Sequence, residues 1–298
     1  MTRRLFILLA ACVLALLPCA DICRARAQQT PEAVVSPYAA DDFAAAMKVL
    51  VPMKDKPAAE IVIACAKHFA GTPYVAGSLE KEPERLRVST RETDCILFVE
   101  MCVAMTLTAR SATPDFETYC GYLQSLRYRN GRVEGYSSRL HYTSEWLCQA
   151  QNNGWLDEIT GRIGGKPYAQ KFSFMSKHPQ SYAQLANAAN GDAASQRQLD
   201  GIKAAEQRLN AKKYYLIDKA AVAASASKIR SGDIICFNSA VPGLDIAHVG
   251  IALRENGVLT FIHASSGAGK VIVNSKPLAD YVVSRKNVNG IRVARLAD

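Results

Sequence analysis

Residues 93–109 read TDCILFVEMCVAMTLTA, an apolar stretch that opens with an acidic residue and a cysteine. Asp94 is a favourable N-cap, so we expect a helix over residues 95–109 with Cys95 in its first turn. The helix is apolar on nearly every face, with Glu100 as its one charged residue, which is typical of a helix buried in a protein core or a membrane. About 15 residues are too few to cross a bilayer, which takes roughly 20. The stretch therefore predicts the central helix of a protein core.

The chain around this helix changes from helical patterns to short β-branched runs at about residue 228. Further helical patterns lie at about residues 40–50, 58–70, 114–127, 141–152, 179–190 and 194–210. Strands are predicted at residues 233–237, 247–253, 258–262, 271–273 and 291–296. Helices followed by antiparallel strands indicate an α+β fold.

The N-terminus has the features of an export signal. Two arginines precede an apolar run over residues 5–17, and Ala-Arg-Ala at 25–27 provides a cleavage site. We therefore expect a signal peptide over residues 1–27, with the mature chain in the periplasm or outside the cell. The 13 apolar residues are too few for a stable membrane span. A lipoprotein is less favoured, because neither Cys19 nor Cys23 follows a small residue.

Composition narrows the class of protein. With 49% apolar and 21% charged residues, the 298-residue chain is globular rather than disordered. Its net charge of +9 falls to +6 once the signal peptide is removed. The basic residues are scattered and form no stripe interleaved with aromatic residues, so a nucleic-acid partner is not expected. The exported chain keeps six cysteines whose pairing the sequence leaves open: Cys65, Cys95, Cys102, Cys120, Cys148 and Cys236.

Cys95 is the candidate nucleophile. Unpaired backbone N–H groups and the helix dipole at a helix N-terminus favour a thiolate, and a nearby histidine would favour it further. Two of the five histidines lie in the predicted strand region: His248 within the run 247–253, and His263 directly after the run 258–262. Imidazoles on neighbouring strands can face one cleft, where the first acts as a base and the second orients it.

Five short motifs occur in an order that resembles a known superfamily. They are Gly-Thr-Pro-Tyr at 71–74, Asp-Cys at 94–95, Gly-Asp-Ile-Ile at 232–235, His-Val-Gly-Ile at 248–251 and Phe-Ile-His-Ala at 261–264. The series resembles the NlpC-type papain-like cysteine peptidoglycan hydrolases. The middle of the chain, including residues 135–142 and 174–179, is similar to the N-acetylmuramoyl-L-alanine amidase-like branch. Ile-Leu-Phe-Val follows the cysteine where common members have Ser-Gly, which fits that branch better.

The resemblance implies a fold and a domain plan. In a papain-like (NlpC-type) fold, the nucleophile helix belongs to an N-terminal helical lobe and packs on a C-terminal antiparallel sheet. The leader and first helix would occupy residues 28–55, and a single catalytic domain would occupy 56–298. A helical insertion at about 130–228 would form one wall of the substrate cleft.

The resemblance also implies an activity. The protein would cleave the amide between N-acetylmuramic acid and L-alanine in peptidoglycan or muropeptides. Cys95 would attack the carbonyl as a thiolate, His248 would exchange protons with it, and His263 would orient His248. The Tyr74 hydroxyl would donate a hydrogen bond to the oxyanion. No cofactor is expected, and the oligomeric state is left open.

Four further residues are candidates for substrate binding. Asp94 would contact an amine or amide of the peptide stem, or else serve only as the helix cap. Arg139, His141 and Trp146 would recognise a sugar or a peptide carboxylate. On helices and loops such residues also serve packing roles, and the sequence does not separate the two.

Three alternative functions stay open. The enzyme could instead cut the γ-D-glutamyl bond to the diamino acid of the same stem. A non-catalytic protein could use the fold to bind muropeptides. A zinc enzyme could use Cys95, His248 and His263 as ligands. Because the chain has no H-E-x-x-H or C-x-x-C motif, we expect no metal.

Overall fold

The computed structural model describes residues 33–298. The predicted signal peptide, residues 1–27, lies outside the described residues, as does the start of the predicted leader. None of the helices in the described part of the chain is both long and apolar enough to span a membrane.

The longer helices lie where the sequence predicts them, apart from the segment at 179–190. They are α2 (Ala39–Leu50), α3 (Ala58–His68), α4 (Cys95–Ala109), α5 (Phe116–Arg127), α6 (Thr143–Asn152) and α9 (Ala193–Asn210). The central helix α4 begins at Cys95 because the Asp94 carboxylate accepts hydrogen bonds from the amides of Ile96 at 3.0 Å and Leu97 at 2.9 Å. The predicted cap and both ends of this helix are confirmed.

An antiparallel sheet holds all five predicted strands. They are β6 (Ile234–Ser239), β7 (Ile246–Glu255), β8 (Val258–Ser265), β9 (Lys270–Val273) and β10 (Val288–Leu296). Three strands not predicted from the sequence join them: β3 (Leu156–Glu158), β4 (Lys166–Tyr168) and β5 (Tyr214–Asp218). The order is β4-β5-β10-β6-β7-β8-β9, and β3 pairs with β10. The α+β prediction is confirmed.

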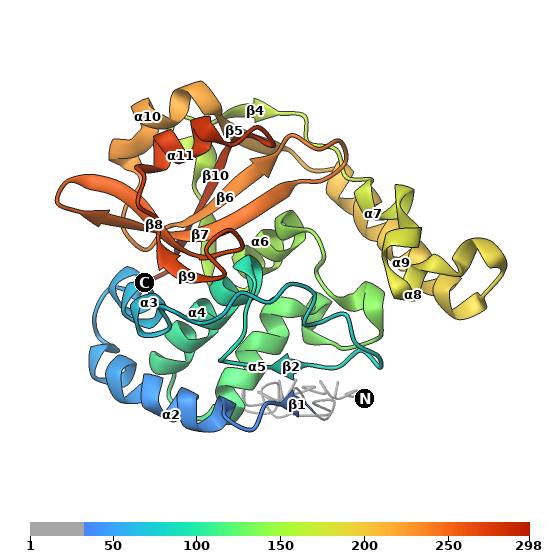
Figure 1. The fold of residues 1–298 in the computed structure, drawn as a ribbon, viewed down its shortest axis with the longest axis horizontal. Coiled ribbons are helices and arrows are strands. Elements are labelled where there is room, and N and C mark those ends of the chain that lie inside the picture. The colour runs from blue at the N-terminus through green and yellow to red at the C-terminus, as the bar shows by residue number, and fades with distance from the viewer. Residues whose placement is uncertain (1–32) are drawn as a thin grey trace, which may run out of the picture. The chain divides into compact units, whose positions relative to one another are not determined.

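Helices lie on both sides of the sheet, with α3 and α4 on one side and α10 (Val222–Ser225) and α11 (Leu278–Ser284) on the other (Figure 1). The side chains on the two faces of the sheet belong to two separate cores. Ile234 and Cys236 of β6 face the core that contains α4, whereas Phe237 lies in the core on the other face. The second core includes Tyr281 of α11, which lies beside the short helix α10. A third cluster of buried residues joins α9 to α7 (Phe174–Lys177) and α8 (Ala183–Ala186).

The segment at about 130–228 is not the purely helical insertion that we predicted. It supplies β3, β4 and β5 to the sheet. The helix expected at 179–190 is broken into two 3-10 turns around the four-residue α8. Pro179 opens the first turn, and the left-handed Gly191 ends the last one.

The packing does not separate the predicted leader at 28–55 from the rest. Phe43, Met47 and Leu50 of α2 are buried in the same core as α4. The ring of Phe43 stacks on Tyr119 of α5 with centroids 5.3 Å apart. Helix α2 is therefore part of the domain that contains Cys95. Two short parallel strands, β1 (Val34–Val35) and β2 (Arg87–Val88), precede and follow it in the chain.

Candidate active site

Cys95 lies at the N-terminus of α4, beside strand β7. Its side chain is half-buried, and it packs against the core. The backbone of Val249, one residue after His248, interacts with the Cys95 sulfur and favours its thiolate form. The structure therefore brings the start of the helix that carries the predicted nucleophile against the strand that carries the first predicted histidine.

His248 and His263 form a hydrogen-bonded pair. Nε2 of His248 on β7 lies 2.7 Å from Nδ1 of His263 on β8, and the two rings are nearly perpendicular. Nε2 of His263 is buried and has no hydrogen-bond partner among the described residues. The His263 ring thus uses Nδ1 to hydrogen-bond His248, as expected of a residue that orients a base.

Gly250 allows the two histidine-bearing strands to approach each other. A Cβ atom at this position would lie 2.8 Å from Cδ2 of Phe261 and 3.2 Å from the Cβ of His263. These distances are below ordinary van der Waals contact, so any side chain would displace β8. The glycine of the His-Val-Gly-Ile motif is therefore required by the packing that brings His263 to His248.

We expect Gly250→Ala to lower kcat/KM by about 10²-fold, because a displacement of roughly 1 Å costs that much at an active site. The loss should fall mainly on kcat, since the pair serves the chemical step. Gly121→Ala on α5 is the matched control, because a Cβ there would meet nothing within 4 Å. Steady-state kinetics and thermal unfolding of both variants check this prediction. Equal kcat in Gly250→Ala and wild type would contradict it.

The resting site holds a neutral thiol beside a neutral imidazole. Burial raises the pKa of Cys95 to about 12, and the Asp94 carboxylate contributes to the increase. Burial also lowers the pKa of His248 to about 3, with smaller effects from His263 and Arg285. We expected the helix N-terminus to promote the thiolate. Nearby backbone amides do act in that direction, but burial outweighs them.

The pH profile should reflect this neutral pair. A base must be unprotonated to act, and burial lowers the pKa of His248 to about 3 and that of His263 to about 4. We therefore expect kcat/KM to have no acid limb near the unperturbed histidine value of about 6.5. Rates measured between pH 4.5 and 8 test this, and an acid limb centred near pH 6.5 would contradict it.

Stability provides the control for that profile. The pKa of each buried histidine is lower in the folded chain than in the unfolded chain. The unfolded chain therefore takes up protons first as the pH falls below about 6.5. Stability is fully present above that pH and declines towards the folded-state values of about 3 and about 4. Thermal unfolding at each pH separates this decline from changes in catalysis.

Two residues near the histidine pair have no signal in the sequence. The ring of Tyr281 on α11 lies 6.0 Å from that of His263, measured between centroids. The guanidinium carbon of Arg285 lies 4.4 Å from the centroid of the Tyr281 ring. The charge of Arg285 helps to lower the pKa of both histidines. The only pattern around these residues is a short amphipathic segment with no catalytic motif.

Tyr74 and Asp94 lie close to Cys95. Residue 74 forms a parallel bridge with Thr93, directly before the cap. Burial raises the pKa of Tyr74, and the charges of Cys95 and Asp94 raise it further, which places all three groups in one environment. Asp94 caps α4 through one carboxylate oxygen. A contact between Asp94 and substrate stays a prediction.

The other three predicted binding residues have different environments. Arg139 is buried, with Nη2 2.7 Å from Oε1 of Glu80. Burial raises the pKa of Asp94, and the charge of Arg139 opposes part of that rise. Nε2 of His141 lies 2.8 Å from the carbonyl oxygen of Tyr136. Trp146 is 1% exposed within the core, so its burial argues against the predicted contact with substrate.

All six cysteines of residues 33–298 are free thiols, and four of them are buried: Cys65, Cys102, Cys120 and Cys236. Within the same residues, no three His, Cys, Asp or Glu side chains are grouped as metal ligands would be.

Known proteins share this fold and sequence pattern. A crystal structure of an N-acetylmuramoyl-L-alanine amidase from Bacteroides uniformis is 35% identical, with a TM-score of 0.75 over 81% of this chain and 99% of that chain. A Bacteroides fragilis protein described as a candidate xylanase is 35% identical, with a TM-score of 0.72 over 78% and 99%. A Legionella pneumophila protein at 21% identity shares the fold, with a TM-score of 0.63 over 87% and 95%.

No curated protein matches the chain. The N-acetylmuramoyl-L-alanine amidase-like family matches residues 64–291, which include Cys95, His248 and His263. That range covers more than half of the sequence and includes the whole of α4, β7 and β8. The chain belongs to the N-acetylmuramoyl-L-alanine amidase-like family.

Proposed function

We propose that the chain is an exported cysteine amidase with a papain-like, NlpC-type arrangement. It would hydrolyse the amide between N-acetylmuramic acid and L-alanine in peptidoglycan or muropeptides. The observation that carries this proposal is the 2.7 Å contact between His248 and His263, formed beside the residue whose backbone meets the Cys95 sulfur. Membership of the amidase-like family supports the choice of bond.

In the proposed mechanism, His248 acts first as a general base. Its Nε2 faces His263, so Nδ1 is the nitrogen that takes the thiol proton as the Cys95 sulfur attacks the carbonyl carbon. The carbon–nitrogen bond breaks when His248 returns that proton to the leaving amine. Water then attacks the thioester carbonyl while His248 takes one of its protons. The carbon–sulfur bond breaks, His248 returns that proton to the Cys95 sulfur, and the muramic acid carboxylate is released. Transfer of the proton during attack suits a pair that is neutral at rest.

Two groups would stabilise the oxyanion. The backbone N–H of Cys95 lies at the start of α4, where the helix dipole favours negative charge. The Tyr74 hydroxyl shares the environment of the Cys95 sulfur, and burial keeps it protonated by raising its pKa. Both donors favour a developing negative charge on the carbonyl oxygen.

Mass analysis of the products from a defined muropeptide tests the proposal. N-acetylmuramoyl-L-Ala-γ-D-Glu-diaminopimelate should yield N-acetylmuramic acid and a peptide that starts at L-alanine. Release of the free diamino acid would instead identify a γ-D-glutamyl endopeptidase. Binding without any product would identify a muropeptide-binding protein.

A further inference from the structure

Helix α11 packs on the sheet beside the histidine pair. The ring of Tyr281 lies 4.8 Å from that of Phe261 and 6.0 Å from that of His263, measured between centroids. The Phe237 ring lies 5.2 Å from Tyr281 and 5.5 Å from His248. A single cluster of rings therefore joins the end of α11 to both histidines.

Arg285 follows α11 directly and adds a positive charge to this cluster. Its guanidinium carbon lies 4.4 Å from the centroid of the Tyr281 ring, and Lys219 donates a hydrogen bond of 2.5 Å to its backbone carbonyl. The ring supports one side of the guanidinium, and the residue is exposed to solvent. The distances through the Tyr281 ring put the guanidinium within about one electrostatic screening length of His263, roughly 10 Å at 0.1 M salt.

The charge of Arg285 acts on the candidate active site. Burial lowers the pKa of His248 and of His263, and the Arg285 charge lowers both further. Burial raises the pKa of Tyr281, the Arg285 charge opposes that rise, and the charge of Cys95 adds to it. Tyr281 therefore interacts with the nucleophile as well as with Arg285. The arginine thus borders the place where the substrate carbonyl would be attacked.

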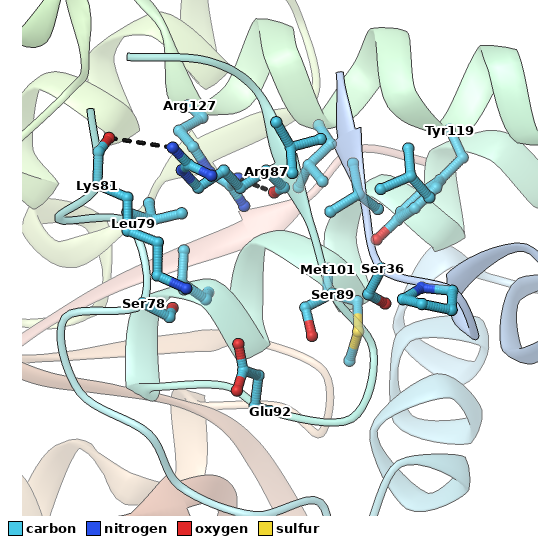
Figure 2. Close-up of a pocket in the computed structure, with 16 residues that line it drawn as sticks. Ser36, Ser78, Leu79, Lys81, Arg87, Ser89, Glu92, Met101, Tyr119 and Arg127 are labelled. Atoms are coloured by element: carbon cyan, nitrogen blue, oxygen red, sulfur yellow. Dashed lines mark hydrogen bonds between the residues drawn. The ribbon is translucent and has the colours of Figure 1, made fainter. Parts of the chain in front are cut away.

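Arg285 has no carboxylate partner. Within residues 33–298, no Asp or Glu side chain lies at ion-pair distance from its guanidinium. Arg127, which packs against α4, shows the contrast, because it binds Glu100 at 2.8 Å and donates to the carbonyl oxygen of Arg87 (Figure 2). A guanidinium has five N–H donors and can bind both oxygens of a carboxylate at once. Arg285 is therefore available to an anionic group of a ligand.

We infer that Arg285 binds the free α-carboxylate of the D-glutamate in the peptide stem, and so selects stems in which this group is not amidated. The inference rests on the proposed function. Because this D-glutamate is linked through its γ-carboxyl, its α-carboxylate is the first anionic group after the scissile amide. Two extended residues span about 7 Å, which is within the range over which Arg285 acts on the histidines. Arg285 would hold the leaving peptide while His248 returns the proton to its amine.

The test compares two defined muropeptides: N-acetylmuramoyl-L-Ala-γ-D-Glu-diaminopimelate, and the same compound with the glutamate α-carboxyl amidated. The wild-type enzyme should hydrolyse the acid form with a kcat/KM about fivefold higher, as expected for one exposed ion pair. The difference should appear in KM, because the contact is the same before and during the reaction. Arg285→Gln should bring the ratio of the two kcat/KM values close to one. Arg285→Lys should keep part of the preference, because it keeps the charge without the planar fork.

The ratio separates binding of the carboxylate from effects on the histidines, since a change in their basicity alters both rates alike. Lys286→Gln is the matched control, because it removes an exposed charge beside Arg285 that forms no ion pair in the described part of the chain. It should keep the wild-type ratio, and thermal unfolding of each variant checks the fold.

Equal kcat/KM values for the two muropeptides in the wild type would overturn this role of Arg285. So would an unchanged ratio in Arg285→Gln, or an equal loss of the ratio in Lys286→Gln. In each of these results, hydrolysis at the muramoyl amide would still support the proposed function. If the wild-type enzyme cleaved neither muropeptide at that amide, the proposed function would fail, and the inference with it.

Discussion

Cys95→Ala should reduce hydrolysis of a defined muropeptide by at least about 10³-fold, because removing the nucleophile of a catalytic triad has effects of this size or larger. The fold should survive, because Cys95 is a half-buried free thiol and the N-terminus of α4 is capped by Asp94, which this variant keeps. Initial rates and thermal unfolding of the purified variant measure both effects.

Cys148→Ala is the matched control, because Cys148 is the other half-buried free cysteine of residues 33–298. It should keep wild-type activity. If Cys95→Ala stayed active while a chelator abolished hydrolysis, a metal would carry the reaction and the cysteine mechanism would be wrong. If Cys95 is the nucleophile, alkylation of the wild-type enzyme should abolish hydrolysis, and a chelator should leave hydrolysis unchanged.

Arg127→Met should lower the free energy of unfolding by about 3–5 kcal/mol, because it leaves a buried carboxylate without its partner. Nε of Arg127 lies 2.8 Å from Oε2 of Glu100, and each side chain is 5% exposed. Burial raises the pKa of Glu100, and the Arg127 charge opposes that rise. Urea unfolding measures the loss through the shift in midpoint at an unchanged slope.

Two variants make this result specific. Arg162→Met removes an exposed ion pair with Asp157, so it should cost less than about 1 kcal/mol. The double variant Glu100→Leu, Arg127→Met removes both buried charges and should recover most of the loss. A loss below about 1 kcal/mol in Arg127→Met alone would contradict the account of α4 as the centre of the core.

The central helix could be predicted because its signals are local. Asp94 as a cap and the long apolar run determine where α4 begins and that it is buried, with no information from the rest of the chain. The five main strands could also be predicted, because a β-branched run bounded by turn residues is a local signal for a strand. The contact between His248 and His263 was expected from the order of the motifs and is present in the structure.

The missed features depend on contacts between distant parts of the chain. Strand β5 pairs with β10, about 70 residues later, and no local pattern specifies that partner. The sequence makes Trp146 a candidate for substrate binding, but the side chain is buried in the core through the packing of α6, which no local pattern specifies. The raised pKa of Cys95 likewise results from burial under elements that the local helix start does not include.

The covalent intermediate tests the central claim most directly. The wild-type enzyme is mixed with N-acetylmuramoyl-L-Ala-γ-D-Glu-diaminopimelate, quenched in acid within milliseconds, and digested for peptide mass analysis. We predict an N-acetylmuramoyl group bound as a thioester to the peptide that contains Cys95, and no adduct in the Cys95→Ala protein. An adduct that also carries L-Ala-D-Glu would contradict the assigned bond. Turnover of the substrate with an adduct on another residue would contradict Cys95 as the nucleophile.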